Sequence, residues 1–261
     1  MSSLSRANLS LSLYFKALCQ RFLFLEHLAE SLEEWSAQRG LGEKSAEVCA
    51  RWTKEKSSFA RLSREVHDAA VAVEDHVASR PRPLLDFRLD RILDDRPADS
   101  FVADLERQIL EYEAAFLSCV LTSAPDLTAK FRKIALQWGR MIAHDFLLGS
   151  GVEGLSAQLR FRGFLAIVKE TLFGGTLGLA ALVVRRHTSD CIEFDLVSCP
   201  HRRLREAAGL AAEVTDFACD LEARVTRGFA TALIPEARHS RTRTQWRGEP
   251  HCKDELILRT T

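Results

Sequence analysis

The sequence has no excess of charge of either sign. Its 261 residues include 36 Lys or Arg and 36 Asp or Glu, so the formal net charge at pH 7 is zero with neutral histidine. Proteins that bind nucleic acid usually carry a basic excess, because much of their affinity comes from neutralising phosphates. The balanced charge therefore argues against nucleic acid as a partner.

Long apolar runs are missing as well. None approaches the roughly 18 apolar residues that indicate a membrane-spanning helix. The opening stretch, MSSLSRANLSLSLYF, has one Arg and an interrupted apolar segment, which is unlike a secretory signal. We therefore expect a cytoplasmic location and no membrane partner.

The cysteine content excludes a complete set of internal disulfides, because seven thiols cannot all pair within one chain. Without an export signal, the thiols are expected to be reduced. Three of them lie on apolar faces of helical patterns and a fourth opens a predicted strand. These four are interpreted as packed core residues: Cys19, Cys49, Cys119 and Cys191.

The first hundred residues carry apolar side chains at helical spacing. Pro81, Pro83 and Pro97 then punctuate a segment rich in Arg and Asp, which is typical of a surface connection. We predict a helical N-terminal region over residues 1–98 and a second domain over residues 99–261.

The hydrophobic period changes within the second domain. After further helical patterns, strand-like runs occur at Leu179–Arg186 and Ile192–Ser198. A helical stretch interrupted near Gly209 follows, and two more strand-like runs begin at Ala237 and Cys252. The predicted fold class is α+β, with a helical N-terminal part followed by a four-stranded antiparallel sheet that has helices packed on one face.

Three segments of this domain carry a recognisable combination of residues: SCPHRRLREAAGL, FACDLE and RTRTQWRGEPHC. Together they resemble the L-2-amino-thiazoline-4-carboxylate hydrolase family over roughly the last half of the chain, most strongly from Phe194 to Cys252. Family members tend to follow the last cysteine with Asp and an aromatic residue, whereas this chain has Lys253 and Asp254, which leaves the substrate open. The matching positions are Cys199-Pro200, Cys219-Asp220, Arg241-Thr242, Thr244, Gly248 and Cys252.

The resemblance implies hydrolysis of a non-peptide carbon–nitrogen bond in a small cyclic amidine or thiazoline-type substrate. A cysteine thiolate suits this chemistry, because it can attack an electrophilic ring carbon and form a covalent intermediate that water resolves. Cys199 precedes Pro200 at a predicted helix start, where the helix dipole favours the thiolate. Cys252 starts the last strand, and Cys219 lies inside a helix, where we expect more burial.

Side chains for proton transfer and substrate binding occur in the same segments. An aspartate or a histidine can move protons, and an arginine can hold a substrate carboxylate through a bidentate contact. This interpretation needs no cofactor, and its partner is a small carboxylate-bearing substrate. The candidate catalytic residues are Cys199, Cys252, Cys219, Asp220 and His239, and the candidate substrate-binding residues are Arg241, Arg243, Thr244 and His201.

Other interpretations of the three cysteines stay open. Cys199, Cys219 and Cys252, with His201 or His251, supply a Cys₃His set suited to zinc, which would make this a non-catalytic metal or small-molecule sensor. The spacings between the cysteines match no common zinc-finger pattern. Simple packing of all three in a core is the third interpretation. The sequence also leaves a homo-oligomer open.

Overall fold

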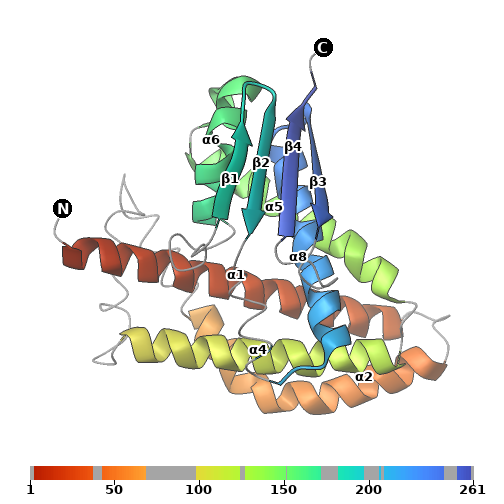
Figure 1. The fold of residues 1–261 in the computed structure, drawn as a ribbon. Helices are drawn as coiled ribbons and strands as arrows, with labels where there is room; N and C mark the ends of the chain where they lie inside the picture. Colours follow the sequence, from red (N-terminus) through yellow and green to blue (C-terminus); the bar gives the residue numbers. More distant parts are fainter. Residues whose placement is uncertain are drawn as a thin grey trace. The chain divides into compact units, whose positions relative to one another are not determined.

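The computed structural model divides into two compact units. Unit 1 comprises Met1–Pro125 with Phe173–Gly178, and unit 2 comprises Asp126–Leu172 with Leu179–Thr261. Figure 1 shows their helices and strands. The structure describes residues 3–37, 43–68, 98–123, 127–150, 152–171, 182–196, 206, 209–243 and 252–259.

Unit 1 is helical, as the sequence predicts for its N-terminal part. Its elements are α1 (Ser3–Ala37), α2 (Glu43–Lys56), the 3₁₀ turn η1 (Ser57–Phe59), a helical continuation over residues 60–68, and α4 (Ala98–Ser123).

The three main helices of unit 1 pack on one another through apolar faces. In α1, buried apolar residues recur every three or four positions, which is the spacing of one helix face: Leu18, Phe22, Leu25, Leu28 and Leu32. Trp52 of α2 and Tyr112 of α4 are fully buried beside them. Among the residues that the structure describes, no helix is long and apolar enough to cross a membrane.

The division between the units falls after α4, whereas the boundary expected from the sequence lies before it, at residues 98 and 99. The physical reason is that α4 packs against α1 and α2. Proline-rich composition indicates where a chain connects two elements, but the burial of apolar faces decides which elements form one unit.

Within the described residues, unit 2 contains three helices of several turns and the four strands of the sheet. The helices are α5 (Thr128–Ser150), α6 (Ala157–Thr171) and α8 (Ala212–Leu233), with the 3₁₀ turn η4 (Val152–Gly154) between the first two. The strands are β1 (Leu182–His187), β2 (Cys191–Leu196), β3 (Ala237–Arg243) and β4 (Cys252–Leu258). They form an antiparallel sheet in the order β1-β2-β4-β3, and in Figure 1 the three helices lie on the same side of it. The predicted α+β fold class is confirmed.

Two hairpins, β1-β2 and β3-β4, meet in the middle of this sheet because β2 pairs with β4. Side chains alternate between the two faces of a strand, and the register aligns the faces of β2, β4 and β3. Asp254 of β4 lies opposite Phe194 of β2 on one side and Arg241 of β3 on the other. Leu256 and Ile192, also opposite each other, are fully buried on the same face. We call this the inner face.

Two glycines hold α5 and α8 in close contact. A side chain on Gly139 of α5 would collide with the backbone of α8, and one on Gly228 of α8 would collide with the backbone of α5.

A third glycine, Gly209, lies just before α8. It has a φ of 69°, and the helix begins at Ala212. The predicted interruption near Gly209 is therefore confirmed.

Candidate active site in unit 2

The structure describes some of the predicted site residues and not others. Side chains of Cys219, Asp220, His239, Arg241 and Cys252 are described. Arg243 is the last residue of β3, and only its backbone is described. Four predicted residues lie wholly outside the described residues: Cys199, His201, Thr244 and His251.

A buried polar cluster occupies the inner face of the sheet. The Nε2 atom of His239 lies 2.9 Å from Oδ1 of Asp254, and Nε of Arg241 donates to both carboxylate oxygens of Asp254 at 2.9 and 3.0 Å. His239 is 3% exposed and Asp254 is fully buried. Strand alternation explains the grouping, because His239 and Arg241 are two residues apart on β3 and share a face.

The carboxylate of Asp254 is held in its charged form by its neighbours. Burial by itself would raise the pKa of Asp254, but the positive charge of Arg241 and the hydrogen bond from His239 outweigh burial. The pKa of Asp254 therefore lies below its usual range. A charged carboxylate at this position fixes the orientation of the His239 ring.

The second ring nitrogen of His239, Nδ1, has different surroundings from Nε2. Within the part of the chain that the structure describes, Nδ1 is buried and has no hydrogen-bond partner. When Nε2 carries the hydrogen that it donates to Asp254, Nδ1 of the neutral ring has a free lone pair. A carboxylate that orients a histidine in this way also stabilises the imidazolium formed when the histidine accepts a proton.

Two of the predicted thiols are buried in the same unit. Cys252 is 5% exposed and shares the inner face of β4 with Asp254, two residues away. Cys219 is 6% exposed and lies on α8, which packs against β3. His239 is opposite Leu256, four residues from Cys252, or about 13 Å along the strand. Asp254 and Arg241 therefore lie between the imidazole and the Cys252 thiol.

Asp220, a candidate for proton transfer, forms ion pairs with two arginines. Oδ2 of Asp220 accepts a hydrogen bond from Nε of Arg132 at 2.5 Å, and its Oδ1 lies 3.6 Å from Nε of Arg224. Arg132 belongs to α5, so this ion pair joins α5 to α8. The contacts of Asp220 are those of a structural ion pair between two helices.

The outer face of the sheet carries a charged ladder. Glu193 lies 2.9 Å from the amine of Lys253 and 3.8 Å from Arg186. Cys191, Glu193 and Glu255 place one ligand atom each within 4.8 Å of one another, but this set is not the predicted zinc set. Burial raises the pKa of the Cys191 thiol above its usual value.

The four cysteines interpreted as packing residues have the expected environments with one exception. Cys19, Cys119 and Cys191 are buried, whereas Cys49 is only partly buried on α2. Burial raises the pKa of Cys19 to about 12, so this thiol stays protonated and unreactive.

The residue that sequence reasoning missed is Asp254. In the sequence, Asp254 stands out only as a departure from the pattern of the resembled family, yet it is the centre of the buried cluster. Strand alternation carries the signal, because Cys252 and Leu256 are buried on one face of β4, and Asp254, which lies between them at the same period, must face inward as well.

No known family, curated protein or solved structure matches this chain.

Proposed function

We propose that unit 2 hydrolyses a non-peptide carbon–nitrogen bond of a small cyclic amidine or thiazoline-type substrate through a cysteine thiolate. The observation that carries the proposal is the buried hydrogen bond between His239 and Asp254 on the sheet face that also holds Cys252. It supplies an oriented base on the same sheet face as the Cys252 thiol, with Asp254 and Arg241 between them, while the Cys219 thiol lies on α8, which packs against β3. The class of substrate comes from the family resemblance alone.

The proposed reaction consumes one water molecule. A thiolate forms a bond to the amidine carbon, and the electrons of the carbon–nitrogen π bond move to nitrogen, which is protonated. Collapse of this adduct breaks the ring carbon–nitrogen bond, and the nitrogen leaves as a protonated amine. Water then adds to the carbon, loses a proton to the base and expels the thiolate.

In this reaction His239 takes and returns the protons, and Asp254 holds the imidazole in one orientation. Arg241 keeps Asp254 charged, which is a different role from the substrate binding expected from the sequence. Cys219 and Cys252 are the described candidates for the nucleophile, and Cys199 remains a candidate outside the described residues.

The test is turnover of L-2-amino-thiazoline-4-carboxylate, followed by mass spectrometry for the gain of one water molecule. Wild type is compared with Cys199→Ser, Cys219→Ser and Cys252→Ser, and Cys191→Ser on the outer face is the matched control. Loss of turnover in one folded variant, with full turnover in the control, identifies the nucleophile. Absence of turnover by the wild type would exclude this substrate.

A second candidate function is a zinc-dependent sensor built on the same thiols. The observation that favours it is the burial of Cys219 and Cys252 on two elements of one unit, since structural zinc sites draw thiolates from separate elements. Zinc measured by mass spectrometry in protein purified without added metal tests this function. Stoichiometric zinc that is lost in Cys219→Ser and in Cys252→Ser would favour the sensor, and metal-free wild type would exclude it.

A further inference from the structure

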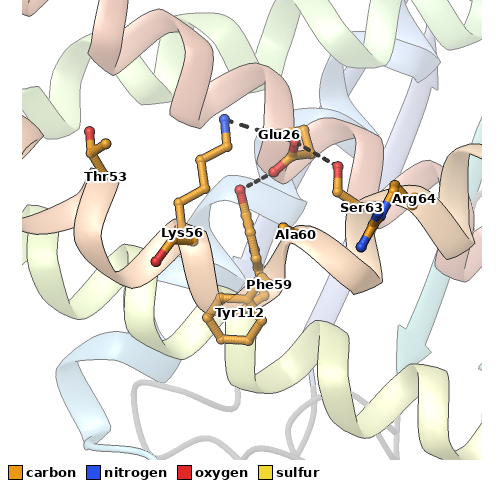
Figure 2. A pocket seen from close by; sticks show the side chains of 9 residues that line it. Glu26, Thr53, Lys56, Phe59, Ala60, Ser63, Arg64 and Tyr112 are labelled. Carbon is orange, nitrogen blue, oxygen red and sulfur yellow. Dashed lines mark hydrogen bonds and ion pairs between the residues drawn. The ribbon is translucent and has the colours of Figure 1, made fainter.

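Unit 1 contains a pocket that is separate from the cluster of unit 2. Its volume is about 580 Å³, within the roughly 300–1,000 Å³ typical of small-molecule sites. Side chains from α1, the end of α2, η1, the helical continuation and α4 line it, and Figure 2 shows Lys56, Ser63 and Tyr112 reaching toward Glu26.

The pocket lies where the helix that starts as α2 changes its geometry. α2 ends at Lys56, the 3₁₀ turn Ser57–Phe59 follows, and the α-helix resumes at Ala60. A stretch of 3₁₀ geometry within a helix is less favourable than continuous α-helix and often occurs at functional positions. Lys56, Phe59 and Ser63 line the pocket on either side of this change.

Aromatic rings form a rigid wall of the pocket. The rings of Phe59 and Tyr112 pack edge to face with centroids 5.1 Å apart. Behind Tyr112, the ring of Trp52 packs at 5.1 Å in the same geometry, and Trp52 is fully buried. Tyr112 and Trp52 are fully buried, so a planar or apolar group in the pocket would meet the Phe59 ring, which these two rings support from behind.

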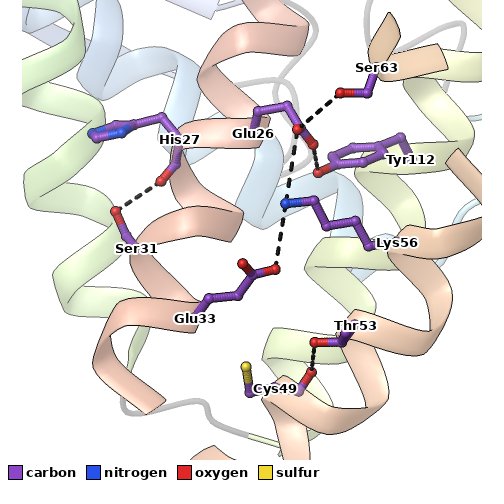
Figure 3. Close-up of polar contacts among 9 residues, drawn as sticks. All are labelled: Glu26, His27, Ser31, Glu33, Cys49, Thr53, Lys56, Ser63 and Tyr112. Carbon is purple, nitrogen blue, oxygen red and sulfur yellow. Dashed lines mark hydrogen bonds and ion pairs between the residues drawn. The ribbon is translucent and has the colours of Figure 1, made fainter. Parts of the chain in front are cut away.

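The carboxylate of Glu26 at the bottom of the pocket is already satisfied. It accepts a short hydrogen bond from the Tyr112 hydroxyl and a longer one of 3.4 Å from Ser63. The amine of Lys56 lies 4.0 Å away (Figure 3). Burial and the Glu26 carboxylate both raise the pKa of Tyr112, so this hydroxyl stays a donor.

The two basic side chains of the pocket differ in their neighbours. Lys56 is shared between two acids, since its amine also lies 3.5 Å from Glu33. Arg64 lines the pocket and, within the described residues, makes no ion pair or hydrogen bond. Arg64 is therefore the positive charge of the pocket that is left to bind a ligand.

We propose that this pocket binds a small organic monoanion, a carboxylate attached to a planar apolar body. Arg64 pairs with the carboxylate, and the partly exposed ring of Phe59 contacts the body. A cationic ligand is disfavoured because it would meet Lys56 and Arg64, while Glu26 already accepts two hydrogen bonds and pairs with Lys56. A dianion is disfavoured because Arg64 is the one basic lining residue that has no acid beside it among the described residues.

Binding of benzoate to the full chain, measured by isothermal titration calorimetry, tests the proposal. We expect a dissociation constant on the order of 1 mM, as is typical of a ligand with so few atoms. Benzamide, which has the same shape without the charge, and benzylamine, which has the opposite charge, are expected to bind at least about tenfold more weakly. Inorganic phosphate is the dianion control and should not compete.

Two matched arginine variants locate the binding. Arg64→Gln should weaken benzoate binding by about tenfold, because it removes one charge-assisted contact. Arg61→Gln is the control, since Arg61 lies one turn earlier and pairs with Glu65 at 2.7 Å; its affinity should equal that of the wild type. The proposal is overturned if benzoate does not bind, if benzylamine binds as tightly, or if both variants behave alike.

Discussion

Gly139 of α5 lies directly against the backbone carbonyl of Val225 on α8. A methyl group on Gly139 would be 2.0 Å from that carbonyl oxygen and 2.8 Å from the amide nitrogen of Phe229. The approach is reciprocal, because a methyl group on Gly228 would be 2.0 Å from the carbonyl oxygen of Leu136. The helices thus meet backbone to backbone, and any side chain at either glycine would force them apart.

Replacement of Gly139 by alanine tests this contact. We expect Gly139→Ala to lower the free energy of unfolding by about 3 kcal/mol, because the added methyl group has no space. Alanine at Gly163 of α6 is the control, since its nearest contact would be the Cδ1 atom of Ile167 at 3.7 Å. Gly163→Ala should leave stability unchanged or raise it by up to about 1 kcal/mol. Urea denaturation measures both, and equal stabilities would contradict the close packing.

The Asp254 carboxylate is expected to stabilise unit 2. Asp254→Asn removes the negative charge that faces Arg241 and His239, and we expect the free energy of unfolding to fall by about 3–5 kcal/mol. Arg224→Gln removes the longer and partly exposed pair with Asp220, and should cost less than about 1 kcal/mol. If chemical denaturation shows that the two variants lose similar amounts of unfolding free energy, the buried cluster contributes no more to stability than the partly exposed ion pair.

Acid should weaken the folded state through Asp254. Its pKa is lowered in the folded protein, so its stabilising contribution is complete above the usual value of 3.8 and is lost as the pH falls through the lower folded pKa. We expect the unfolding free energy of the wild type to decline more steeply than that of Asp254→Asn between about pH 5 and about pH 2. Parallel declines in urea titrations would show that Asp254 does not titrate as stated.

A histidine that transfers protons should be needed for turnover but not for folding. His239→Gln retains an NH group near the position that contacts Asp254 but removes the basic nitrogen, so we expect kcat to fall by about 10²–10⁴-fold. His187→Gln on the exposed end of β1 is the control and should have the turnover of the wild type. Circular dichroism verifies the fold, and full turnover by a folded His239→Gln would remove His239 from the mechanism.

Most of the element types could be predicted from the sequence, because hydrophobic period is a local property. The alternation of Ile192, Phe194 and Leu196 predicts β2, and these residues are all buried on one face. Gly209 predicts the interruption before α8 for an equally local reason, since a positive φ favours glycine. The same locality explains why the boundary between the units was expected too early: composition near Pro97 says nothing about what α4 packs against.

The candidate site depended on information that is not local. His239 and Asp254 are 15 residues apart, and their contact follows from the register of β3 against β4. Arg132 and Asp220 are 88 residues apart, and their ion pair follows from the crossing of α5 and α8. The sequence alone thus determined which segments are helices and strands and that the fold is α+β. Only the tertiary structure decided that Asp254 binds His239 and Asp220 binds Arg132, because these contacts depend on strand order and helix packing, which no local pattern encodes.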